Sequence, residues 1–154
     1  MSRKHRDALL QELTEQFRAY QTATDRLDEL AQRIMGINRT DGRCLDILDR
    51  AGRITAGRLA AESGLTTGAV TAVVDRLEKA GMARRVADPA DRRRVRIEVT
   101  PRLWELTGPL MMPFITESQA ILDDYSTEEL ERFTRFLERV IEVQAKHTER
   151  VRNL

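Results

Sequence analysis

The stretch Gly64–Pro101, GLTTGAVTAVVDRLEKAGMARRVADPADRRRVRIEVTP, decides the fold of this 154-residue chain. Glycine supplies a tight turn at Gly64 and ends the following helix at Gly81. Between the two glycines, apolar side chains recur at the spacing of one helix face; they belong to Val70, Val73, Val74 and Leu77. The segment therefore begins with a turn and one short helix, which Thr66 or Thr67 caps and which reaches Ala80.

A β-hairpin is expected directly after this helix. Residues 94–99 alternate strictly between polar and apolar side chains, which is the period of a half-buried strand. Residues 82–87 are the expected partner strand, although their alternation is weaker. Asp88-Pro89 suits the first two positions of a type I turn, so residues 88–93 form the connecting loop.

Two further helices are expected before Gly64. Residues 40–50 place Leu45, Ile47 and Leu48 on an inward face, and residues 55–63 begin with a threonine cap. Two short helices joined by a glycine-containing turn form a helix-turn-helix, and the hairpin after it gives the winged-helix order. The sequence therefore predicts a mainly α fold with a small β-hairpin wing.

Long amphipathic helices are expected on both sides of this centre. Residues 7–35 carry apolar side chains at a heptad-like spacing, typical of a helix packed along another helix. A helix is also expected from Pro101 to about Leu122, and a capping box at 126–129 begins a last one. The expected organisation is a winged helix-turn-helix DNA-binding domain at 37–100, flanked by a helical dimerisation region at 1–36 and 101–154.

The second helix of a helix-turn-helix is the one that enters a DNA major groove. With the valines of this helix turned inward, its outer face is small near the N-terminus, where Gly68 indicates a close approach by another molecule. Threonine hydroxyls donate to phosphates or to base edges, and arginine binds guanine or phosphate. The expected DNA contacts of this helix come from Thr66, Thr67, Gly68, Thr71, Ala72 and Arg76.

The expected hairpin tip carries three consecutive arginines, Arg92, Arg93 and Arg94, beside Asp91. Residues 84–96 contain six arginines and two aspartates, whereas residues 103–131 contain seven acids and no basic residue. Minor grooves have a negative potential that attracts inserted arginine. The alternative is a solvated charged turn that keeps an edge strand from pairing with other chains.

The run VDRLEKAG at 74–81, DPADRR at 88–93 and Val99-Thr100 resembles the DNA-binding signature of the MarR family of transcriptional regulators. The resemblance covers residues 40–101. It implies a homodimer with interlocked terminal helices that binds a pseudo-palindromic operator, usually as a repressor, and that a small aromatic or phenolic ligand releases from DNA. It also implies that Asp75 pairs with Arg93 as a wing scaffold, with Asp91 in the same motif, and that Arg92 lies nearest the minor groove.

The stretch after Thr100 departs from the usual pattern of this family and contains an apolar cluster. Trp104, Met111 and Met112 belong to it. Packing in the core or in a dimer interface is one interpretation. The other is a ligand pocket that these residues line together with Tyr20.

Several other functions find no support in the sequence. No nucleophile–base pair, glycine-rich phosphate loop or zinc-type Cys/His spacing is found, so neither an enzyme nor a metal or cofactor site is expected. Cys44 is expected to be a small core residue. The longest apolar run, at 110–115, is too short for a bilayer, and we expect a cytoplasmic protein. The alternative function is a winged-helix protein-interaction module without sequence-specific DNA binding.

Overall fold

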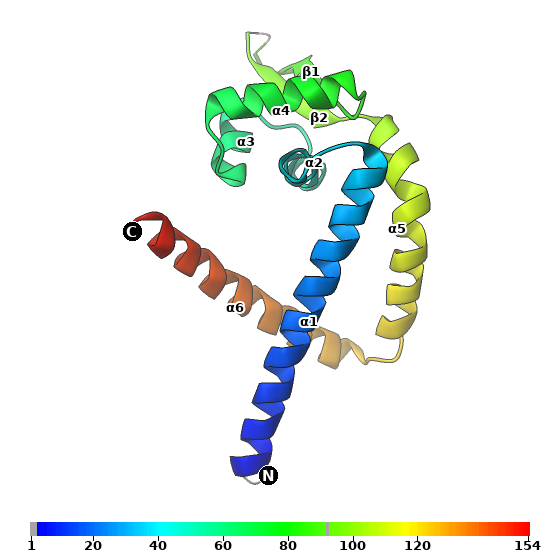
Figure 1. Ribbon diagram of the computed structural model, residues 1–154, viewed down its shortest axis with the longest axis vertical. Coiled ribbons are helices and arrows are strands. Elements are labelled where there is room, and N and C mark those ends of the chain that lie inside the picture. The colour runs from blue at the N-terminus through cyan, green and yellow to red at the C-terminus, as the bar shows by residue number, and fades with distance from the viewer. Residues whose placement is uncertain (1–2, 92) are drawn as a thin grey trace. The chain divides into compact units, whose positions relative to one another are not determined.

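The computed structural model describes residues 3–91 and 93–154 of the chain (Figure 1). The elements in chain order are α1 (Arg3–Met35), α2 (Arg39–Ala51), α3 (Ala56–Ser63), α4 (Thr67–Lys79), β1 (Ala83–Ala87), β2 (Val95–Val99), α5 (Pro101–Leu122) and α6 (Thr127–Arg152). The expected mainly α fold with a small hairpin wing is thereby confirmed.

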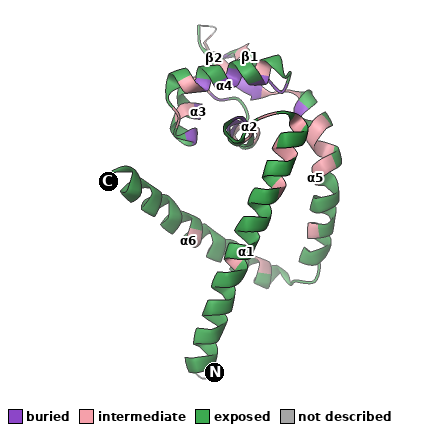
Figure 2. Ribbon diagram, viewed as in Figure 1, coloured by how far each residue is buried: buried purple, intermediate pink, exposed green. Residues whose placement is uncertain are grey.

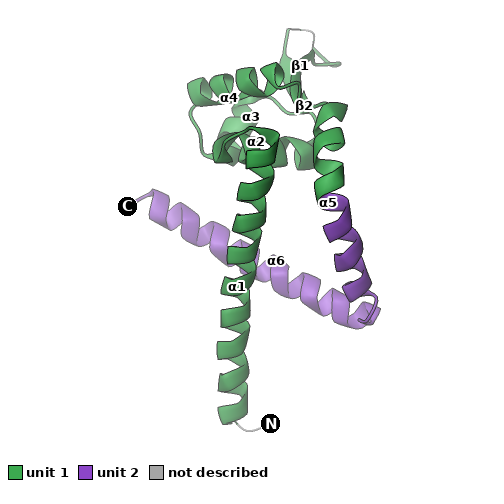
Figure 3. Cartoon of the chain, turned by 45° about the vertical axis from the view of Figure 1, so that its right-hand side comes forward, with its two compact units in different colours: residues 1–110 green, residues 111–154 purple. Residues whose placement is uncertain are grey.

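Contacts divide the chain into two compact units, residues 1–110 and 111–154 (Figure 3). The boundary falls inside α5, so the first unit contains the helix-turn-helix, the hairpin, α1 and the first half of α5. The second unit contains the rest of α5 and α6. Within the described residues, no helix has the combination of length and apolar character that a membrane span requires.

The core lies in the first unit, between α2, α3, α4 and the hairpin (Figure 2). Helix α4 turns the predicted apolar face inward: Val70, Val74 and Leu77 are completely buried. Helix α2 contributes Leu48 and Cys44, both without exposed surface, so the expectation that Cys44 is a core residue is confirmed. Aliphatic packing of this kind, rather than helix propensity alone, holds such short helices in place.

Local signals set the ends of these helices. The Thr66 hydroxyl accepts a hydrogen bond from the Ala69 N–H at 3.3 Å, which caps α4, and Thr55 caps α3 in the same way. Gly64 ends α3 in the left-handed conformation, with φ of 72°, and its N–H binds the Ala60 carbonyl. Any other residue would be strained in this conformation, so the turn of the helix-turn-helix depends on glycine at this position.

The hairpin is a two-stranded antiparallel sheet whose register pairs Ala83 with Val99 and Ala87 with Val95. One residue outside the strands extends it, because Ile54 exchanges backbone hydrogen bonds of 3.1 and 2.7 Å with Ile97. Both isoleucine side chains are buried. This bridge joins the segment before α3 to the wing, and it links the wing to the helical core.

The long helices contribute little to this core. No residue of α1 or α6 is buried in the described part of the chain, and in α5 only Leu103 is. Helix α6 begins with the predicted capping box, in which Ser126 and Glu129 bind each other's backbone N–H groups. In the second unit, the rings of Tyr125 and Phe133 meet edge to face at 5.4 Å.

Candidate nucleic-acid interface

The outward face of α4 carries small and hydroxyl-bearing side chains. In the first half of the helix the exposed residues are Thr67, Gly68, Thr71 and Ala72, preceded by the exposed cap Thr66 and opposite the buried valines, while Asp75, Arg76 and Lys79 are exposed further along. A Cβ atom added at Gly68 would meet nothing within 4 Å, so the protein itself does not require glycine there. The Thr71 hydroxyl donates to the Thr67 carbonyl at 3.1 Å, which leaves its oxygen free to accept a hydrogen bond.

Arg76, the other residue of α4 expected to contact DNA, is bound to a carboxylate of α2. Its Nε and Nη2 atoms donate to the two oxygens of Asp41 at 3.1 and 2.5 Å. This hydrogen bonding raises the pKa of the Arg76 guanidinium. Asp41 is buried, whereas 48% of the Arg76 side chain is exposed. Arg76 therefore has a partly structural role. Among the described residues its Nη1 atom has no assigned hydrogen-bond partner, so this atom remains available for a further contact.

The opposite side of α4 is joined to the wing through Arg85 of β1. The Arg85 guanidinium binds Asp75 at 2.8 Å and also binds Glu78, whose carboxylate accepts a bond from the Arg85 N–H as well. The partner of Asp75 is therefore Arg85, which corrects the pairing with Arg93 that the resemblance implied. Arg85 lies on the strand that directly follows α4, whereas Arg93 lies in the turn at the far end of the hairpin.

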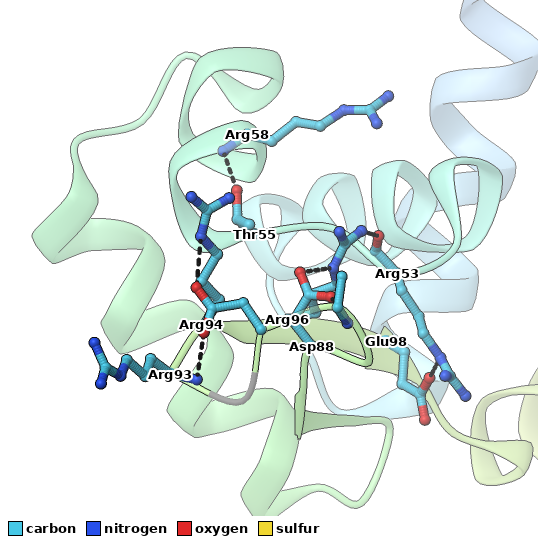
Figure 4. Close-up of polar contacts among 10 residues, drawn as sticks. Arg53, Thr55, Arg58, Asp88, Arg93, Arg94, Arg96 and Glu98 are labelled. Carbon is cyan, nitrogen blue, oxygen red and sulfur yellow. Dashed lines mark hydrogen bonds and ion pairs between the residues drawn. The ribbon is translucent and has the colours of Figure 1, made fainter.

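Asp91 organises the wing tip. Its carboxylate accepts a hydrogen bond from the Arg93 N–H at 3.0 Å and contacts the Arg94 guanidinium at 3.4 Å. The Arg93 and Arg94 side chains are exposed, and the Arg93 guanidinium extends away from the hairpin (Figure 4). Arg92, the expected minor-groove residue, lies outside the described residues. These contacts are compatible with a scaffold role for Asp91, which stays a prediction.

Two buried carboxylates hold the wing by ion pairs that the sequence did not predict: Asp88, where the turn begins after β1, and Glu98, toward the base of β2. Asp88 accepts a bond from the Ala90 N–H and binds Arg96 at 2.6 Å, which together lower the Asp88 pKa. Glu98 binds Arg53 (Figure 4) and also Arg84 at 2.6 Å. These bonds lower the Glu98 pKa. Four of the arginines around the wing are therefore occupied by structure rather than free for a ligand: Arg53, Arg84, Arg85 and Arg96.

The sequence only partly predicts these buried ion pairs of the wing. Strict alternation in β2 places Arg96 and Glu98 on the same side, but alternation alone suggests a solvated face. In the structure Glu98 is only 7% exposed, because Arg53 from the loop before α3 and Arg84 from β1 cover it. A buried carboxylate needs such partners, since an unpaired charge there would be strongly destabilising.

The residues expected to line a ligand pocket are mostly exposed. Tyr20 and Trp104, in the first unit, are 66% and 56% exposed, and Met112, in the second, is 55% exposed. Met111 is half-buried. A cavity of about 1380 Å³ in the first unit is lined by α1, α2 and Ile37 and includes none of these four residues. Across residues 3–91 and 93–154, no group of three or more His, Cys, Asp or Glu side chains is arranged to hold a metal ion.

Comparisons with known proteins agree with this geometry. Residues 37–95 match the sequence profile described as the MarR family. The chain is 36% identical, over 98% of both chains, to a Bacillus subtilis protein named the uncharacterized HTH-type transcriptional regulator YcgE. The structure resembles a MepR mutant from a multidrug-resistant S. aureus clinical isolate, with a TM-score of 0.67 at 20% identity, over 86% of this chain and 96% of that chain. It also resembles another S. aureus MepR mutant, bound to an oligodeoxyribonucleotide, with a TM-score of 0.56 at 21% identity, over 86% and 97%.

Proposed function

Because this chain belongs to the MarR family of winged helix-turn-helix transcriptional regulators, we propose that it represses transcription by binding a pseudo-palindromic DNA operator as a homodimer. The family resemblance inferred from the sequence is confirmed by the matching profile and by the relative. Proteins of this family are regulators without enzymatic activity, in agreement with the expectation that the chain is not an enzyme.

The main observation behind this proposal is the exposed face of α4. The backbone at Gly68, the threonine hydroxyls and Ala72 are exposed on it, while ion pairs to α2 and β1 hold the two sides of the helix. A face with short side chains allows the helix to approach base edges in the major groove, and hydroxyls bind phosphate or bases. The wing arginines, from 92 to 94, are proposed to enter the adjacent minor groove. A MepR mutant of similar fold is bound to an oligodeoxyribonucleotide, which supports DNA binding as such.

A second copy of the chain is the proposed partner of the long helices. Apolar side chains lie exposed on α1, α5 and α6, including Leu10, Leu13, Ile34, Phe114, Ile121, Leu137 and Ile141. Exposed apolar side chains in this number indicate an interaction surface, since the core of the protein lies elsewhere, in the helix-turn-helix and the wing. We therefore propose that residues 1–36 and 101–154 form the dimerisation region and 37–100 the DNA-binding domain. Two copies of α4 then contact half-sites about 34 Å apart, one duplex turn.

A small aromatic or phenolic effector is proposed to release the dimer from DNA. Tyr20, Trp104 and Met112 offer exposed apolar surface that such a ligand could cover, together with Met111. The same side chains also suit packing against the second copy, so the effector requires a direct test. Release of bound operator by a panel of aromatic acids and phenols tests it, and an operator complex undisturbed by every compound assigns these residues to packing.

Selection of bound genomic fragments at physiological salt tests the DNA-binding proposal. The expected result is enrichment of one sequence with two inverted half-sites. Thr71→Ala is expected to weaken binding of that sequence. Thr148→Ala, which removes the same intrahelical bond from α6, is the matched control, with sedimentation of that variant to verify that it remains a dimer. Selection without any enriched sequence would refute operator binding and favour the protein-interaction module. Sedimentation at micromolar concentration is expected to show a dimer, and a monomer would refute the assembly.

A further inference from the structure

The exposed face of α4 lies between two ion pairs that hold the helix from opposite flanks. At 100° per residue, Arg76 falls on the flank next to the buried face, and it reaches back to Asp41 of α2. Asp75 and Glu78 fall on the other side, and both bind Arg85 of the wing. The two contacts differ in exposure, because the Asp41 side chain is only 4% exposed, whereas those of Asp75 and Glu78 are 60% and 32% exposed.

Asp41 is itself firmly placed. It lies in the first turn of α2, where its backbone N–H donates to the Asn38 cap at 2.9 Å. A carboxylate at a helix N-terminus is also favoured by the helix dipole. On the next residue, Gly42, the Gln32 side chain of α1 lies so close that an added Cβ would be 2.8 Å from its Nε2 atom. Asp41 is therefore a rigid anchor at the point where α1, α2 and α4 come together.

The Asp41–Arg76 contact supplies a restraint that the apolar core does not. Valine and leucine contacts are non-directional, so they tolerate small rotations of α4 about its own axis. Two parallel hydrogen bonds from a planar guanidinium to a carboxylate fix both distance and angle. A small rotation would change which side chains of the outward face point at a base edge, and sequence discrimination depends on that geometry.

We propose that Asp41 is a positioning residue for DNA recognition, which acts through Arg76 to set the rotation of α4 on α2. The inference rests on the proposed operator binding. It also reassigns Arg76, whose bound edge serves the orientation of the helix while its remaining edge is free to meet the DNA backbone. Asp41 thus supports binding to DNA, although its own negative charge is repelled by the phosphates.

The negative charge of Asp41 and its positioning role have opposite effects on DNA affinity, so the direction of the change in affinity distinguishes them. If Asp41 acted only as a charge near the interface, Asp41→Asn would strengthen binding to every duplex alike, since one negative charge is removed. If Asp41 positions α4, Asp41→Asn weakens operator binding at least about tenfold, from the loss of a charge-assisted contact, and leaves non-specific binding unchanged or stronger. The ratio of specific to non-specific affinity is the quantity that separates the two cases.

The experiment measures both affinities, at one salt concentration, for full-length wild type, Asp41→Asn and Asp46→Asn. Asp46 is the matched control, because it lies on the same helix but is exposed and paired only with Arg50 among the residues that the structure describes. Melting temperature and sedimentation accompany each variant. Arg76→Lys, which keeps the charge but cannot form the two-pronged contact, decides the matter if Asp41→Asn is poorly folded.

A fall in the specificity ratio for Asp41→Asn or Arg76→Lys, with Asp46→Asn unchanged, supports the proposal. An unchanged ratio in a folded dimeric variant overturns the positioning role while leaving operator binding intact. Wild-type protein that binds the selected operator no better than unrelated DNA overturns operator binding itself, and with it this inference.

Discussion

Gly68→Ala is expected to make the free protein more stable and its operator complex weaker. Gly68 is the second residue of α4, is exposed, and has open space where a Cβ would lie. Glycine in a helix costs about 0.5–1 kcal/mol relative to alanine. Because the first turn is less demanding than a helix centre, we expect a gain of about 0.5 kcal/mol per protomer, or roughly 1–2 °C in melting temperature.

The added methyl group lies on the face that is proposed to enter the major groove. If the loss is comparable to that of one mismatched base pair, roughly 1–3 kcal/mol, operator affinity should fall roughly 5- to 150-fold. Thermal denaturation followed by circular dichroism measures the first effect, and fluorescence anisotropy with labelled operator measures the second. The opposite signs are informative because loss of folding cannot explain weaker binding by a more stable protein.

Gly57→Ala is the matched control. Gly57 is the second residue of α3, also follows a threonine cap, and also has nothing within 4 Å of an added Cβ. The same stabilisation is expected there, without the loss of operator affinity. If Gly68→Ala keeps full affinity for the operator, the close approach of DNA to this part of α4 is refuted. If both variants lose affinity equally, the effect does not belong to the face of α4.

Three further predictions concern the wing and the assembly. The pKa values of Asp88 and Glu98 are lowered in the folded state, so their contribution to stability is complete above the ordinary values of 3.8 and 4.5 and is lost as pH falls below them. Denaturant unfolding measured from pH 7 to pH 3 should therefore show the free energy of unfolding falling in that acid range. The fall should be less steep for Glu98→Gln. Arg93→Ala should lower DNA affinity and reduce the slope of log K against log salt by roughly 0.9 for each phosphate that is no longer neutralised, and an unchanged slope would exclude a phosphate contact by Arg93. Ile141→Glu, at a 65% exposed apolar position of α6, should shift the dimer toward monomer in sedimentation, while Gln144→Glu should not; an equally tight dimer would place the interface elsewhere.

Local patterns in the sequence were sufficient for most of the fold. The spacing of Val70, Val74 and Leu77 predicts the buried face of α4, and Thr66 with Gly81 predicts its ends. Alternation in residues 94–99 predicts β2, which the structure places at Val95–Val99. These features depend on residues only a few positions apart, so their physical causes, helix capping and the periods of helix and strand, are already present in a short segment.

By itself, the sequence thus determined the helices, the hairpin, the family and the side chains on the outward face of α4. The tertiary structure alone decided which charges pair. Arg76 meets Asp41 across 35 positions of sequence, and Glu98 meets Arg53 across 45. Asp75 selects Arg85 because β1 returns beside α4, although the family motif pointed to Arg93. A charge has no preferred partner until packing sets the distances and burial sets the cost of leaving it unpaired, and both arise only when distant segments of the chain come together.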